Sequence, residues 1–229
     1  MRLAFANFST YNARYRMPSA ESGSTALNMW YSFNYGSIHF TQIDTETDYI
    51  GAPGDEYSSK NGGFGDQVAW VTADLAAAAA ARAGGRVTWM IASGHRPIYS
   101  RASCNADGTP SGTAAATQAA FEPLFHQYGV NIYFAGHMHS VEVQLPTYNN
   151  TVYGSFNKPP YTTYVVTGAA GCIEGHTSYS GAPLPAWSAY TNGEDIGLSM
   201  LYFASASQLT WEFRRGTDGA VLYNFTLTR

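Results

Sequence analysis

Two histidines separated by one residue, His137 and His139, follow the apolar run 130–135, which reads as a strand. On an extended backbone, side chains at positions i and i+2 point to the same side, and their Cα atoms lie ~6.5 Å apart. Two such imidazoles can therefore bind one metal ion or two neighbouring ions. Only six histidines occur in 229 residues. The pair is a candidate metal site, although motifs this short also arise by chance.

A third histidine, His95, follows another apolar run and a glycine, Gly94, in the same local pattern as Gly136 and His137. If the two runs form neighbouring strands of one sheet, both loops lie at the same edge. Three imidazoles with an open position suit catalytic zinc. With added carboxylates, they suit a hydrolase that uses two metal ions. The alternative is that His95 only satisfies a hydrogen bond in the core.

The elements that must position these residues alternate between strand and helix, which favours an α/β core with active residues at the carboxyl ends of strands. A hairpin is expected over 28–43, a helix from its N-cap at Asp66 to the Gly84-Gly85 pair, and a strand over 86–92. A second helix over 113–128 contains Pro123. Further strands, over 161–167, 197–203, 208–213 and 220–227, predict an antiparallel C-terminal section.

Composition excludes several classes of protein. Apolar residues make up 45% of the chain and charged residues 12%, so the chain can bury a large core. The net charge of -4 and the lack of a basic run argue against nucleic acid or an anionic membrane as partner. No apolar stretch reaches the ~18 residues that span a bilayer. The sequence gives no indication of the oligomeric state.

Three N-x-S/T sequons begin at Asn7, Asn149 and Asn224. Together with only two lysines, they favour a secreted or extracellular glycoprotein. The first residues, however, lack the apolar segment and cleavage site of a signal peptide. The sequence therefore predicts a fragment or truncated product of a secreted parent.

The three histidine-bearing and glycine-bearing segments carry a resemblance to a known family. Gly94-His95-Arg96-Pro97, the loop 136–139 and the segment 166–171 resemble, in this order, the purple acid phosphatases among the calcineurin-like metallophosphoesterases. Stretches 15–19, 30–33, 44–48 and 209–213 are also similar, so the resemblance extends over essentially the whole chain.

This resemblance implies a four-layer αββα sandwich that hydrolyses small phosphate monoesters. It also implies a dinuclear centre in which Fe(III) lies beside Fe, Zn or Mn(II). By position, His95 and His137 would bind the divalent ion and His139 the ferric ion. The metals would stabilise the phosphoryl oxygens and activate the attacking water.

Three earlier motifs of such proteins, D-x-G, G-D-x-x-Y and G-N-H-[DE], are absent before Tyr15. We therefore expect residues 1–229 to form a single metallophosphoesterase-like domain without its amino-terminal part, with 160–229 as the C-terminal section. Without the bridging carboxylate, dinuclear binding by this chain alone should be weak or absent. Asp44 is a conceivable substitute, but the expectation is a solvated loop acid.

Other residues are weaker candidates. His176 is a candidate general acid for the leaving alcohol, and Arg96 a candidate phosphate contact. Cys104 and Cys172 both lie in loops near the expected site, so a disulfide between them is a further hypothesis. His39, within a strand, and His126, near a helix end, are interpreted as structural.

Three functions remain open at this point. The first is an acid phosphatase with a dinuclear metal centre, here incomplete. The second is a catalytically inactive fragment or pseudoenzyme that keeps the scaffold. The third is a mononuclear zinc hydrolase with three histidine ligands, which needs none of the absent motifs.

Overall fold

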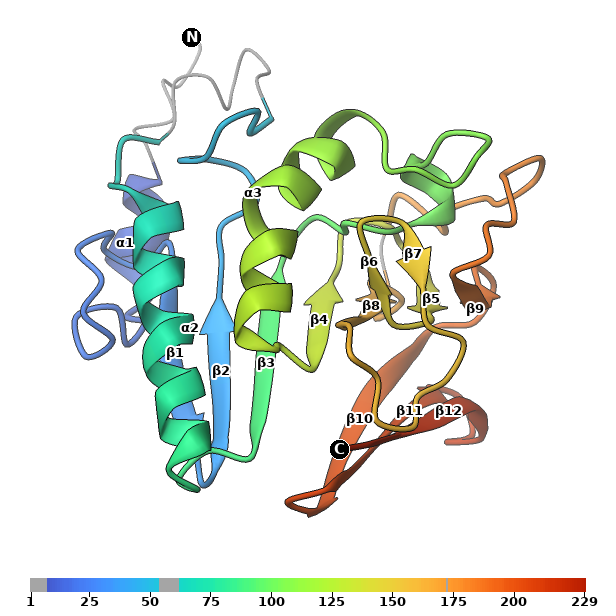
Figure 1. The fold of residues 1–229 in the computed structure, drawn as a ribbon. Coiled ribbons are helices and arrows are strands. Elements are labelled where there is room, and N and C mark those ends of the chain that lie inside the picture. Colours follow the sequence, from blue (N-terminus) through green and yellow to red (C-terminus); the bar gives the residue numbers. More distant parts are fainter. Residues whose placement is uncertain (1–7, 54–61, 172) are drawn as a thin grey trace, which may run out of the picture.

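A computed structural model describes residues 8–53, 62–171 and 173–229 of the chain (Figure 1). The elements are, in chain order, α1 (Ser9–Arg14), β1 (Tyr31–Tyr35), β2 (Ile38–Gln42), α2 (Gln67–Ala83), β3 (Trp89–Gly94), the 3₁₀ turn η2 (Arg101–Ser103), α3 (Gly112–Tyr128), β4 (Ile132–Ala135), β5 (Val141–Gln144), β6 (Thr147–Tyr148), β7 (Thr151–Val152), β8 (Thr163–Thr167), β9 (Ser188–Asn192), β10 (Gly197–Ser205), β11 (Gln208–Arg215) and β12 (Val221–Thr228).

The main sheet has seven strands in the order β1-β2-β3-β4-β8-β5-β9. Its centre is parallel, from β2 through β3 and β4 to β8. The strands at both ends are antiparallel to their neighbours, β1 on one side and β5 and β9 on the other. A separate antiparallel sheet, β10-β11-β12, closes the chain. The predicted α/β core with an antiparallel C-terminal section is confirmed.

Alternate residues of the central strands face two different cores, as a strand's two-residue period requires. Met90 and Ala92 of β3 pack with buried side chains of α2 and α3. Trp89 and Ile91 pack instead with buried side chains of β11 and β12. Helices therefore cover one face of the main sheet and the three-stranded sheet the other, as Figure 1 shows. These are three layers of an αββα sandwich.

Local chemistry favours the start of α2 and the end of α3. Asp66 caps α2 by accepting a hydrogen bond from the Ala69 amide, and the alanine-rich sequence has high helix propensity. In α3, Pro123 is accommodated inside the helix, and Gly129 ends it in the left-handed conformation, as is common at helix C-termini.

The central strands bring the two histidine loops together. β3 and β4 are parallel neighbours, with Ile91 opposite Ile132 and Gly94 opposite Ala135. The residues that follow each strand, His95 and Gly136, therefore leave the sheet at the same edge. A hydrogen bond from the Gly136 amide to the His95 carbonyl, 2.9 Å long, ties the loops to each other.

Candidate metal centre

The loop that carries the H-x-H motif is tightly turned. The Met138 amide donates to the Gly136 carbonyl at 2.6 Å, and His137 between them has φ 57°. A turn of this type is rare and strained for a residue with a side chain. The expected extended backbone is therefore not present. Each ring is instead oriented by its own neighbours.

The residue that follows β8, Gly168, approaches this loop closely and holds it in place. A Cβ atom on Gly168 would lie 2.0 Å from the Met138 carbonyl oxygen, so only glycine fits there without movement. The Gly168 amide also donates to the Ser140 carbonyl at 3.0 Å. The glycine-containing segment noted in the sequence thus has a direct physical role at the histidine loop.

His95 and His137 meet, as the sequence predicted for neighbouring strand ends. His137 Nδ1 lies 3.1 Å from His95 Nε2, and the ring centroids are 4.9 Å apart. Partial burial lowers the pKa of both imidazoles, and the Arg96 guanidinium lowers both further. Both rings are therefore favoured in the neutral form that binds metal ions.

Glu46 is a member of this site that sequence reasoning did not single out. Its carboxylate accepts two hydrogen bonds from Arg96, from Nε at 2.8 Å and from Nη2 at 3.0 Å. The remaining Arg96 nitrogen, Nη1, lies 3.1 Å from His137 Nε2. His95 Nε2 is 3.9 Å from Glu46 Oε1. Arg96, predicted as a phosphate contact, thus lies between a carboxylate and an imidazole.

Asp44 lies beside Glu46 and is buried, so the expectation of a solvated loop acid is wrong. Its carboxylate accepts from the Glu46 amide at 2.7 Å and from Thr47 Oγ1 at 2.8 Å. The buried Gln67 side chain accepts from the Asp44 amide and donates to its carbonyl. Burial raises the pKa of Asp44. Asp44 therefore shapes the loop that presents Glu46.

His139 faces a different segment. Its Nδ1 is 3.1 Å from the Gly175 carbonyl, and its amide donates to Thr177 Oγ1 at 2.8 Å. Because a carbonyl only accepts, Nδ1 must donate here, and in the neutral tautomer of the ring Nε2 then carries the lone pair that a metal ion could use. His139 Nε2 lies 4.0 Å from the Glu174 carboxylate.

Within residues 8–53, 62–171 and 173–229, no three histidine, cysteine or carboxylate side chains lie close enough to hold one metal ion. Two of the three predicted histidine ligands are thus brought together, and the third is directed elsewhere.

A buried carboxylate, Glu142, ties the loops around the site and was also missed by the sequence argument. It accepts from the Arg101 amide at 2.8 Å and from the Tyr179 hydroxyl at 2.8 Å, and the Ser100 hydroxyl also donates to it. Burial raises its pKa. The only signal in the sequence was its position three residues after His139.

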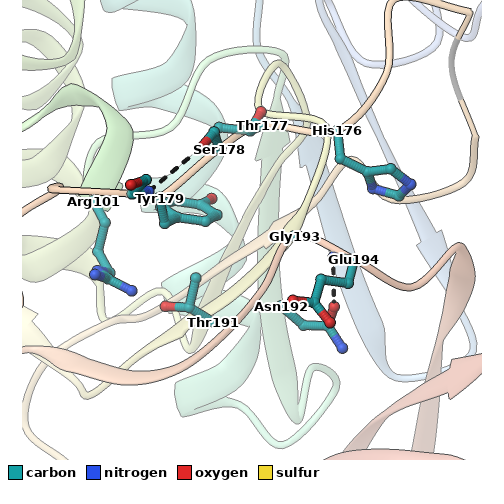
Figure 2. A pocket seen from close by; sticks show the side chains of 10 residues that line it. Arg101, His176, Thr177, Ser178, Tyr179, Thr191, Asn192, Gly193 and Glu194 are labelled. Carbon is teal, nitrogen blue, oxygen red and sulfur yellow. Dashed lines mark hydrogen bonds between the residues drawn. The ribbon is translucent and has the colours of Figure 1, made fainter.

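His176, the candidate general acid, lies on the rim of a pocket of about 610 Å³. Figure 2 shows Arg101 and Tyr179 on one side of this pocket and His176 and Glu194 on the other. His176 is exposed. A smaller hollow of about 220 Å³ is lined in part by His95, Asp44 and Glu46.

The remaining predictions from the sequence concern residues outside the histidine site. His39 is buried and lies 3.0 Å from the Asp74 carboxylate, and His126 stacks on Tyr148, in agreement with structural roles. Asn149 and Asn224 are exposed. Asn7 and Cys172 lie outside the described residues, so the first sequon and the disulfide between Cys104 and Cys172 remain predictions.

Comparison with known proteins identifies relatives of this chain. Residues 161–223 match a family model described as iron/zinc purple acid phosphatase-like protein C. An acid phosphatase from Aspergillus ficuum is 32% identical over 97% of this chain and 41% of its own length. Human acid phosphatase type 7 is 31% identical over 89% of this chain and 45% of its own length.

A solved structure shows the same relationship. The purple acid phosphatase from yellow lupin seeds superimposes with a TM-score of 0.65 at 26% identity, covering 87% of this chain and 32% of that protein. The chain spans less than half the length of the curated relatives just described. Sequence relatives, family model and fold agree that the chain belongs to the purple acid phosphatase family of metallophosphoesterases.

Proposed function

We propose that this chain supplies the histidine side of a phosphate monoester hydrolase with a dinuclear centre of Fe(III) and Fe, Zn or Mn(II). The observation that carries the proposal is the contact between His95 Nε2 and His137 Nδ1 at 3.1 Å. Neutral imidazole nitrogens are common metal ligands, and rings this close together could serve the same ion. The two imidazoles therefore fit one ion as a pair of ligands.

Among the described residues, the side chains that suit the proposed metal centre are this pair of imidazoles and His139, through the lone pair of Nε2. Such ions polarise phosphoryl oxygens and make a nucleophile available from water at moderate pH. His95 and His137 would hold the divalent ion and His139 the ferric ion. The neutral imidazoles bring no charge of their own, so carboxylates from outside the described set would have to balance two cations.

His176 would donate a proton to the leaving alcohol. Its support is its place one residue after Gly175, whose carbonyl lies beside His139, and its exposure at the rim of the polar pocket. In the same proposal Arg96 would contact phosphate after leaving Glu46, because a guanidinium can bind two phosphate oxygens at once. Small phosphate monoesters are the substrate class.

One observation favours the alternative of an inactive chain. The Arg96 guanidinium lies 3.1 Å from His137 Nε2, and among the described residues no three histidine, cysteine or carboxylate side chains form a group that could hold one ion. A mononuclear zinc site would require His139 to turn from Gly175 towards His95 and His137.

Metal analysis and activity distinguish these possibilities. The purified chain is reconstituted with Fe(III) and Zn(II) and assayed with p-nitrophenyl phosphate, beside His137→Ala and the exposed control His126→Ala. Two bound ions with violet colour, and activity lost only in His137→Ala, support the dinuclear hydrolase. No bound ion and no hydrolysis support the inactive chain. One zinc ion with activity supports the mononuclear site.

We further propose that the protein is a secreted or extracellular glycoprotein and that residues 1–229 fold as one domain. The exposure of Asn149 and Asn224 supports the modification. Asn149 lies in the turn between β6 and β7 with φ 46°. In the part of the chain that the structure describes, no helix is both long and apolar enough to cross a membrane.

A further inference from the structure

Arg96 and Glu46 form a charged pair directly on the histidines that the proposed metal ion would use. Arg96 donates to Glu46 through Nε and Nη2 and reaches His137 Nε2 through Nη1. Its side chain is 19% exposed. The pair joins residues 50 positions apart, so it exists only in the folded chain.

These contacts determine which nitrogen of each ring carries a proton. A guanidinium only donates hydrogen bonds, so His137 Nε2 must accept from Arg96 and carries no proton. The neutral His137 ring then has its proton on Nδ1, which lies 3.1 Å from His95 Nε2. His95 Nε2 accepts the hydrogen bond from the Nδ1–H group of His137. The two hydrogen bonds therefore run in the same direction: Arg96 donates to His137, and His137 donates to His95.

That arrangement occupies the two nitrogens that a metal ion would need. A ligand nitrogen must present its lone pair, but His137 Nδ1 holds a proton and the His95 Nε2 lone pair is already used. For His137 to bind through Nδ1, its proton has to move to Nε2. Nε2–H would then face the N–H groups of Arg96, two donors without an acceptor, which is unfavourable.

We propose that Arg96 is a positioning residue that holds the His95–His137 pair in a metal-free form, and that metal binding requires Arg96 to leave His137. Glu46 would then accept the hydrogen bond from His137 Nε2–H, as carboxylates commonly do for metal-bound histidines. This inference rests on the proposed function for the identity of the ligands. The statement that Arg96 holds the histidine pair concerns the metal-free chain alone.

The surroundings allow the side chain to move while the backbone stays in place. The Arg96 amide donates to Thr45 Oγ1 at 2.7 Å, and its carbonyl accepts from the Tyr133 hydroxyl at 2.7 Å. Beyond the Cα atom, the described partners of Arg96 are Glu46 and His137. The hollow beside His95 and Glu46, about 220 Å³ in volume, adjoins the carboxylate that would be released.

The first test measures proton positions in the metal-free 229-residue chain by ¹⁵N NMR of the histidine rings. We expect His137 to be protonated on Nδ1 and unprotonated on Nε2, and the preference to weaken in Arg96→Met, which cannot donate. The matched control Arg86→Met removes an exposed arginine and should leave the signals unchanged. A metal-free wild-type chain with the His137 proton on Nε2 overturns the inference, whether or not it binds metal.

The second test is Zn²⁺ binding by calorimetry. Arg96→Met is expected to bind Zn²⁺ about tenfold more tightly than the wild type, the effect of removing one competing hydrogen bond from a charged donor. Adding Glu46→Gln to Arg96→Met should weaken binding at least tenfold. Equal affinities of wild type and Arg96→Met overturn the inference. If neither chain binds Zn²⁺, the proposed function is contradicted, while the expected proton position still supports Arg96 as the partner of His137.

Discussion

Replacing Gly168 by alanine should displace the histidine loop, and the size of the effect follows from the structure. The added Cβ atom would lie 2.0 Å from the Met138 carbonyl oxygen, whereas ordinary contact begins at 3.4 Å. The loop would therefore have to move by more than ~1 Å, at a cost of about 1–3 kcal/mol in the free energy of unfolding. His137 precedes Met138, so its contact with His95 should loosen as well.

Gly136 provides a matched control in the same loop. A Cβ atom on Gly136 would lie 3.8 Å from the nearest atoms beyond its chain neighbours, which belong to His95, so Gly136→Ala should change stability by no more than about 0.5 kcal/mol. Guanidinium denaturation gives the free energies, and histidine ring NMR signals report the contact. If Gly168→Ala is as stable as Gly136→Ala and its His95 and His137 signals are unchanged, the close-approach argument is refuted.

Two further predictions concern buried carboxylates. Burial raises the pKa of Glu142, so its contribution to stability is fully present below the ordinary glutamate value of ~4.3 and is lost as pH rises through the higher folded value. Denaturation at several pH values should therefore show a smaller loss of stability on raising the pH in Glu142→Gln than in the wild type; parallel curves would contradict this. Asp44→Ala leaves the Glu46 amide and Thr47 Oγ1 without their acceptor, and should cost about 1–3 kcal/mol in thermal or chemical unfolding. An unchanged midpoint would contradict that role for Asp44.

Local chemistry made most of the elements predictable. The helix after Asp66 depends on a cap three residues from its partner and on alanine propensity, both of which are readable along the chain. The strands of the C-terminal sheet show the two-residue alternation of one buried and one exposed face, as in β11. The juxtaposition of His95 and His137 also followed from sequence, because parallel neighbouring strands end at one edge.

The organisation of the site was not predictable in the same way. Glu46 reaches Arg96 across 50 positions and Glu142 reaches Ser100 across 42, and no local pattern relates such residues. The sequence around Asp44 predicts a solvated acid in a loop, and the burial of Asp44 depends on Gln67 from a distant helix. The turned backbone at His137 depends on the close approach of Gly168, the residue after β8, where there is no room for a side chain.

By itself, the sequence determined the kinds of side chain available and the strands that carry them, because propensity and periodicity act over a few residues. It thereby determined the family and the pairing of two histidine loops. Only the tertiary structure decided which atoms face one another. It directed His139 towards Gly175 and set Arg96 between Glu46 and His137, because those contacts arise from the packing of segments that no short-range rule connects.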